Sequence, residues 1–110
     1  RGKVSIAIAI VDSCMIPRTV CDEAKKLASK QTGIPTDRIL IAATHTHSAP
    51  SVMNYCLGTM ADPAYTKFLP IKIAEGIRQA HAKLEPARIG WSQVRAPGRL
   101  KEPWATCSGP

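Results

Sequence analysis

Two histidines that are one residue apart, His45 and His47, are the residues whose type and spacing first suggest chemistry. They end the apolar run "ILIAATHTHSAP", which covers residues 39–50. Alternate residues of a β-strand share a face, so both imidazoles would point the same way if the strand continued to its tip. Neutral imidazole is a common protein ligand for metal ions. The spacing therefore predicts a metal site at a strand end.

Asp12 ends a second apolar run, "VSIAIAIVD", over residues 4–12. If the two runs are neighbouring parallel strands, their carboxyl ends meet at one sheet edge, where ligand sites of open α/β sheets form. A carboxylate and two imidazoles suit zinc and other divalent ions. We therefore take Asp12, His45 and His47 as the candidate site residues and Zn²⁺ as the candidate cofactor. The loop over residues 49–61 follows and could cover the site.

Other reactive side chains in the chain fit structural roles better. His81 falls beside Ile77 on a predicted helix, which suits a histidine at the edge of the core. Neither Ser13 nor Ser48 lies in a G-x-S-x-G elbow, so we expect turn or capping roles for them. Cys14 is near the expected site but shows no sign of activation. The chain has four cysteines and no CxxC pair, and we interpret them as small apolar side chains.

Three segments have the pattern of strands. Residues 4–12 and 38–44 are nearly continuous apolar runs, typical of parallel strands that are buried on both faces. Residues 87–94 alternate in part and are expected to form a third strand. The predicted order is β-α-β-α-β, an α/β fold with a mainly parallel sheet and helices packed on it. Residues 1–97 would form this region, and residues 98–110 an irregular tail.

Two segments have helical spacing of apolar residues. The first covers residues 17–31, and Gly33 lies just past its end, where a left-handed cap suits glycine. The second should begin with Asp62 as N-cap and Pro63 at the first helical position, and should run to about residue 84. Pro70 should kink this helix or mark a later start. Its apolar stripe consists of Leu69, Ile73, Ile77, Ala80 and Leu84.

Composition limits the class of protein. With 110 residues, 45% of them hydrophobic and 21% charged, the chain has the composition of one small globular domain. Its net charge of +7 gives a basic surface. The basic residues are scattered and are not interleaved with aromatic residues, so we do not expect nucleic acid as a partner. Attraction to anionic substrates or to a membrane surface fits the charge better.

Three stretches together resemble the N-terminal catalytic domain of the neutral/alkaline, non-lysosomal ceramidase family. They are "VSIAIAIVDSCMIP", "TGIPTDRILIAATHTHSAP" and "AEGIRQAHAKLEPARIGW", and the likeness covers roughly residues 4–97. The resemblance implies a zinc-dependent hydrolase of amide bonds in N-acylsphingosine or a related lipid. It implies His45 as a zinc ligand, His47 beside the metal to assist the carbonyl or the water, and Asp12 on the same edge. It also implies a secreted, periplasmic or membrane-associated protein.

The chain departs from the family pattern in two places. Ala49, Ser51 and Val52 stand where the family has glycines, which leaves the substrate open. The family's remaining zinc ligands, a histidine, a glutamate and a tyrosine, would come from downstream of this chain. We therefore expect the isolated chain to bind zinc weakly and to be inactive. A non-catalytic binding or scaffold fragment, and another metal-dependent amidohydrolase with HxH at a strand end, are the alternatives.

Overall fold

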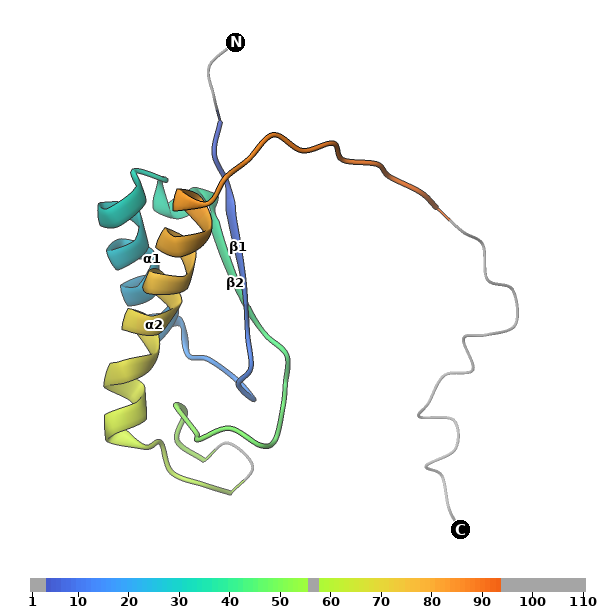
Figure 1. The fold of residues 1–110 in the computed structure, drawn as a ribbon. Coiled ribbons are helices and arrows are strands. Elements are labelled where there is room, and N and C mark those ends of the chain that lie inside the picture. Colours follow the sequence, from blue (N-terminus) through green and yellow to red (C-terminus); the bar gives the residue numbers. More distant parts are fainter. Residues whose placement is uncertain (1–3, 56–57, 94–110) are drawn as a thin grey trace.

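The computed structural model describes residues 4–55 and 58–93. Figure 1 shows two strands with two helices beside them, in the order β-α-β-α. The elements are β1 (Ala7–Val11), α1 (Arg18–Thr32), a short 3-10 helix (Thr36–Arg38), β2 (Ile39–Ala43) and α2 (Pro63–Ala82). The two strands pair in parallel, in a register that runs from Ala7 opposite Ile39 to Val11 opposite Ala43. The α/β class and the parallel sheet are therefore confirmed.

The first helix begins and ends close to where the sequence predicts. Val20, Ala24 and Ala28 lie on one buried stripe of α1, which packs into the core. Gly33 follows the helix with a φ of 74°, the left-handed conformation that glycine adopts without a Cβ penalty. Its N–H donates to the carbonyl of Ser29 at 2.8 Å, which satisfies one of the last helical carbonyls.

The second helix begins at the predicted proline. The Asp62 carboxylate accepts a hydrogen bond from the N–H of Tyr65 at 2.8 Å, and Pro63 occupies the first turn. Pro70 lies inside the helix and is fully buried, so the helix runs through this residue instead of starting after it. The predicted stripe is buried at Leu69, Ile73 and Ile77. Its last two positions are exposed: Ala80 lies in the last turn of the helix, and Leu84 lies beyond the end of the helix at Ala82.

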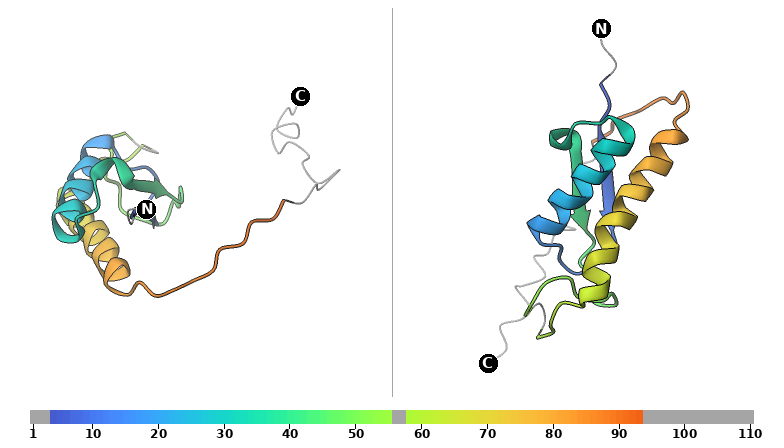
Figure 2. Two further views of the ribbon diagram at one scale, coloured as in Figure 1. Left: turned by 90° about the horizontal axis from the view of Figure 1, so that it is seen from above. Right: turned by 90° about the vertical axis from the view of Figure 1, so that its left-hand side faces the viewer.

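Both helices cover the same face of the sheet, as the view from above in Figure 2 shows. The inward side chains of β1, such as Ala7 and Ala9, pack against the helices. On the other face, Ile6, Ile8 and Ile10 are 67%, 62% and 65% exposed. The prediction of strands buried on both faces is therefore wrong, because no element of the described residues packs on this second face.

The predicted third strand is also wrong for the part of it that the structure describes. Residues 87–93 have no strand pairing and lead away from the sheet (Figure 1). Ile89 is 80% exposed and Trp91 is 92% exposed. A β-like sequence gains stability as a strand only by pairing and by packing its side chains, and here the segment does neither. Val94 and the predicted tail over residues 98–110 lie outside the described residues.

Within the described part of the chain, no helix is long and apolar enough to cross a membrane.

Candidate metal centre

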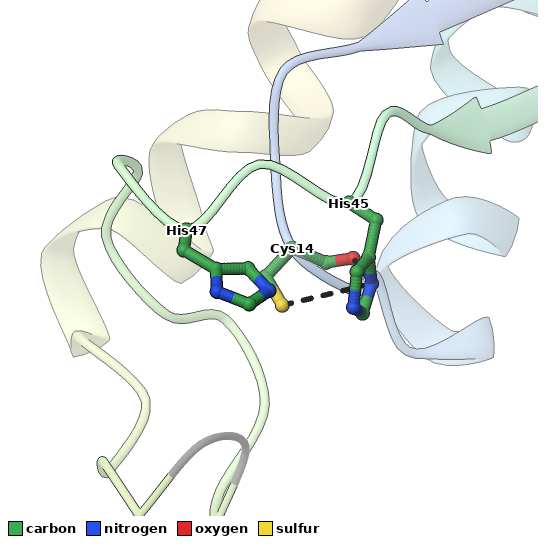
Figure 3. A group of neighbouring side chains, drawn as sticks. All are labelled: Cys14, His45 and His47. Atoms are coloured by element: carbon green, nitrogen blue, oxygen red, sulfur yellow. Dashed lines mark hydrogen bonds between the residues drawn. The ribbon is translucent and has the colours of Figure 1, made fainter. Parts of the chain in front are cut away.

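The carboxyl ends of the two parallel strands bring the candidate residues together. Backbone pairing continues past the strands, since the N–H of Thr44 donates to the carbonyl of Val11 and that of His45 to the carbonyl of Ser13, both at 3.0 Å. The segment that follows β1 therefore lies beside the segment that follows β2, as Figure 3 shows. Asp12 lies at this edge as predicted. Its carboxylate accepts a hydrogen bond from the Thr44 hydroxyl at 3.1 Å.

His45 and His47 lie close together, but not because they share the face of a strand. β2 ends at Ala43, and His45 has a φ of 63°, in the left-handed region that non-glycine residues seldom adopt. The two imidazole rings are 5.1 Å apart between centroids, at an angle of 72°. Both side chains are exposed. The predicted proximity is confirmed, and a loop produces it.

Cys14 is the third member of the cluster, and Figure 3 shows its thiol beside both imidazoles. The residue is buried, with 9% of its surface exposed. Its Sγ lies 3.8 Å from Nδ1 of His45, and its carbonyl oxygen lies 3.0 Å from the same nitrogen. A carbonyl only accepts, so a proton on Nδ1 would be donated to it and the lone pair would remain on Nε2. Metal-binding histidines commonly make this kind of hydrogen bond.

These three residues form a group that could hold a metal ion. One ligand atom from each of Cys14, His45 and His47 can be chosen so that all lie within 4.8 Å of one another. Zinc bond lengths of about 2.3 Å to sulfur and 2.0–2.1 Å to nitrogen give tetrahedral edges of about 3.3–3.6 Å. A closure of at most about 1.2–1.5 Å therefore brings the widest pair to that geometry, and rotation of the exposed imidazoles can supply it. Asp12 does not belong to this group.

Sequence reasoning overlooked Cys14 as a ligand. The pairing of the strand ends was the signal that could have identified it. Because Val11 lies opposite Ala43 in the parallel register, the residues that follow the two strands come together. Ser13, just before it, is buried, and within the described part of the chain its hydroxyl has no hydrogen-bond partner. The predicted capping role of this side chain is therefore absent there.

The other predicted candidates lie elsewhere or at the surface. Ser48 is exposed, and its N–H lies 3.4 Å from the Thr46 hydroxyl, in a turn as expected. His81 is half-buried on α2 and lines a pocket with Val4 and Ile77, far along the helix from Asp62. It therefore occupies the core-edge position that the sequence predicts.

The segment between the histidines and α2 is held in place by a few contacts. Val52 is buried in the hydrophobic core, with 3% exposed. The N–H of Asp62 donates to the carbonyl of Ser51 at 2.8 Å, and the N–H of Ala61 to the Asn54 side chain at 3.0 Å. Residues 56–57 lie outside the described residues. Val52, which replaces a glycine of the ceramidase pattern, thus anchors the loop that carries His47.

An apolar groove of about 600 Å³ runs between β1 and α2. Ala9, Leu69 and Ile73 line it, and Asp12 lies at the end of β1 that faces the histidine-bearing loops. Its size falls in the range of ligand-binding clefts. Lys72 also lines the groove and donates to Glu75 at 2.9 Å.

The fold and the site together define a small parallel α/β unit with a cysteine and two histidines at the carboxyl edge of its sheet. Comparisons of the chain with protein-family models, with curated proteins and with solved structures found no match. The likeness to the ceramidases therefore rests on the sequence motifs alone.

Proposed function

We propose that this chain carries part of the active site of a zinc-dependent hydrolase of amide bonds, of the ceramidase type. The observation that carries the proposal is the group of Cys14, His45 and His47, whose ligand atoms lie within 4.8 Å of one another. The group stands at the carboxyl edge of a parallel sheet, where α/β proteins bind their ligands. Its two imidazoles are exposed, so a substrate can approach them.

Each of the proposed site residues has a separate chemical role. His45 binds the metal, and its backbone N–H bond to Ser13 fixes the loop that carries it. Zinc, when bound, supplies a Lewis acid that polarises a carbonyl and makes water more acidic. His47, whose ring is 5.1 Å from that of His45, exchanges a proton with the reacting water or the leaving amine. Asp12 borders the site and is oriented by the Thr44 hydroxyl.

The proposed substrate is a lipid amide. The apolar groove between β1 and α2 supports this, because its volume of about 600 Å³ and its apolar lining suit an acyl chain. Asp12 at one end of the groove links it to the strand edge that carries the metal group. The net charge of +7 supports work at an anionic membrane surface.

The test compares metal retention with amide hydrolysis in three histidine variants. His45→Ala should lose both zinc and activity. His47→Ala should retain most of the zinc and lower the hydrolysis rate by about 10²-fold or more, as for loss of a positioned acid–base group. His81→Ala removes a histidine outside the site and should change neither quantity.

Zinc is measured by mass spectrometry on the purified chain. Hydrolysis is measured with a fluorogenic N-acyl lipid, in the natural protein that carries this sequence. Retention of zinc by His45→Ala together with its loss from His47→Ala would reverse the two roles. Zinc binding without hydrolysis in the natural protein would instead support the binding or scaffold alternative.

A further inference from the structure

We propose that the Cys14 thiolate binds the same metal ion as His45, so that the centre has a sulfur ligand. This inference rests on the metal site of the proposed function, but it does not depend on amide hydrolysis. Neither the sequence motifs nor the ceramidase resemblance assigns a role to Cys14.

The positions of the side chains carry the inference. One ligand atom from each of Cys14, His45 and His47 can be chosen so that all lie within 4.8 Å of one another. Cys14 Sγ lies 3.8 Å from Nδ1 of His45, so the thiol stands directly beside this imidazole ring. Nδ1 itself lies 3.0 Å from the Cys14 carbonyl oxygen, so Nε2 is the nitrogen left for the metal. Rotation of the exposed ring brings Nε2 to the sulfur–nitrogen edge of about 3.6 Å that a tetrahedral zinc site requires.

The surroundings of Cys14 also favour this role. Backbone hydrogen bonds to the carbonyls of Val11 and Ser13, just before Cys14, fix this loop beside the histidine loop. Because Cys14 is buried, with 9% exposed, its sulfur is presented from the protein side, while the His45 imidazole is presented from the solvent side. An ion held between them keeps further positions for water and for other ligands. On binding, the thiol transfers its proton to the solvent, and the thiolate forms the bond to the metal.

A sulfur ligand changes which ions the site selects. Thiolate is a soft ligand that favours zinc and similar ions, whereas magnesium, calcium and manganese favour oxygen ligands. We therefore expect the chain to bind Zn²⁺ and Co²⁺ and to discriminate against Mg²⁺ and Mn²⁺.

The experiment uses Co²⁺ as a spectroscopic substitute for zinc on the full chain under reducing conditions. A cobalt–thiolate bond produces a sulfur-to-cobalt charge-transfer band in the near ultraviolet, which nitrogen and oxygen ligands do not produce. The wild-type chain should show this band when Co²⁺ is titrated to saturation. Cys14→Ser should lose it, and its affinity should fall by about 100-fold or more, since even the partners of metal ligands contribute 10–100-fold.

Two further variants separate Cys14 from the other thiols and from folding defects. Cys21→Ser is the matched control, because burial raises the pKa of the Cys21 thiol and its Sγ contacts the carbonyl of Ile16, not the histidines. It should keep the band. A chain in which Cys21, Cys56 and Cys107 are all replaced by serine keeps only Cys14 and should also keep the band, whether or not Cys14→Ser folds.

The outcomes distinguish this inference from the proposed function. Co²⁺ binding without the charge-transfer band, or a band that survives in Cys14→Ser, overturns the role of Cys14 and leaves a histidine-based site standing. A wild-type chain that binds no Co²⁺ and no Zn²⁺ overturns both. A band that depends on Cys14, with no amide hydrolysis in the natural protein that carries this sequence, supports the sulfur ligand and contradicts the hydrolase.

Discussion

Replacement of His45 by glycine separates the role of this residue in the fold from its role at the metal. His45 has a φ of 63°, and a left-handed backbone costs a non-glycine residue about 1 kcal/mol. Glycine removes that strain. It also removes the hydrogen-bond contact between Nδ1 and the Cys14 carbonyl, which is 3.0 Å long and contributes about 1 kcal/mol.

The greater freedom of glycine in the unfolded chain costs roughly another 0.5–1 kcal/mol. The three effects together leave a net loss of about 1 kcal/mol or less for the metal-free protein. The effect on metal-dependent stability is much larger. A ligand at 100 times its dissociation constant stabilises a native protein by about 2.7 kcal/mol, and this gain disappears if the variant no longer binds the ion.

The assay is urea denaturation with and without zinc, followed by circular dichroism. The wild-type chain and His81→Ala should gain free energy of unfolding when zinc is added, whereas His45→Gly should gain none. Similar zinc-dependent gains in the wild type and in His45→Gly would refute the reasoning. A loss of several kcal/mol in the metal-free His45→Gly variant would show that the loop depends on His45 for more than the metal.

Four further substitutions, one of them a control, test the packing and the electrostatics of the fold. Ile73→Ala should lower the free energy of unfolding by about 2–5 kcal/mol, because this side chain is buried in the core. Ile71→Ala, on the exposed side of the same helix, is the control and should lower it by less than about 1 kcal/mol. Urea denaturation measures both changes. Ser13→Ala should raise the free energy of unfolding by about 1 kcal/mol, because it removes a buried hydroxyl that has no partner in the described part of the chain. The hydrogen bond from the Lys72 ammonium group lowers the pKa of Glu75, so Lys72→Met should raise this pKa. An NMR titration of the Glu75 carboxyl group measures the change.

The local signals in the sequence predict the helices and their ends well. Gly33 and Asp62 act through hydrogen bonds to residues three or four positions away, so their roles are visible in a short window of sequence. The stripe of Val20, Ala24 and Ala28 is equally local. The parallel pairing of β1 and β2 follows from the helix that separates them.

The failures concern contacts that a short window does not contain. Ile8 and Ile10 have the composition of a strand buried on both faces, but burial depends on whether another element packs there, and in the described residues none does. The segment that contains Trp91 has strand-like alternation, but residues 87–93 pair with no strand in the described part of the chain. Sequence periodicity measures the preference of a segment and not the presence of its neighbours.

Only part of the site is predicted from the sequence, because the rest depends on contacts between segments that are distant in the chain. The position of Asp12, His45 and His47 at one sheet edge follows from parallel strands that both end there. The involvement of Cys14 depends on how the chain turns after β1, and the left-handed conformation of His45 is not evident from its residue type. The residue types indicate metal chemistry, whereas the backbone selects which side chains meet.

X-ray absorption at the zinc edge of the zinc-loaded wild-type chain tests the central claim most directly, because it reads the atoms bound to the metal. The account predicts one sulfur at about 2.3 Å together with nitrogen or oxygen ligands at about 2.0–2.1 Å, and an imidazole contribution that is lost in His45→Gly. A zinc ion with only nitrogen and oxygen ligands would contradict the role of Cys14. A zinc ion bound by several sulfurs, with no imidazole, would place the metal on other cysteines and contradict the site itself.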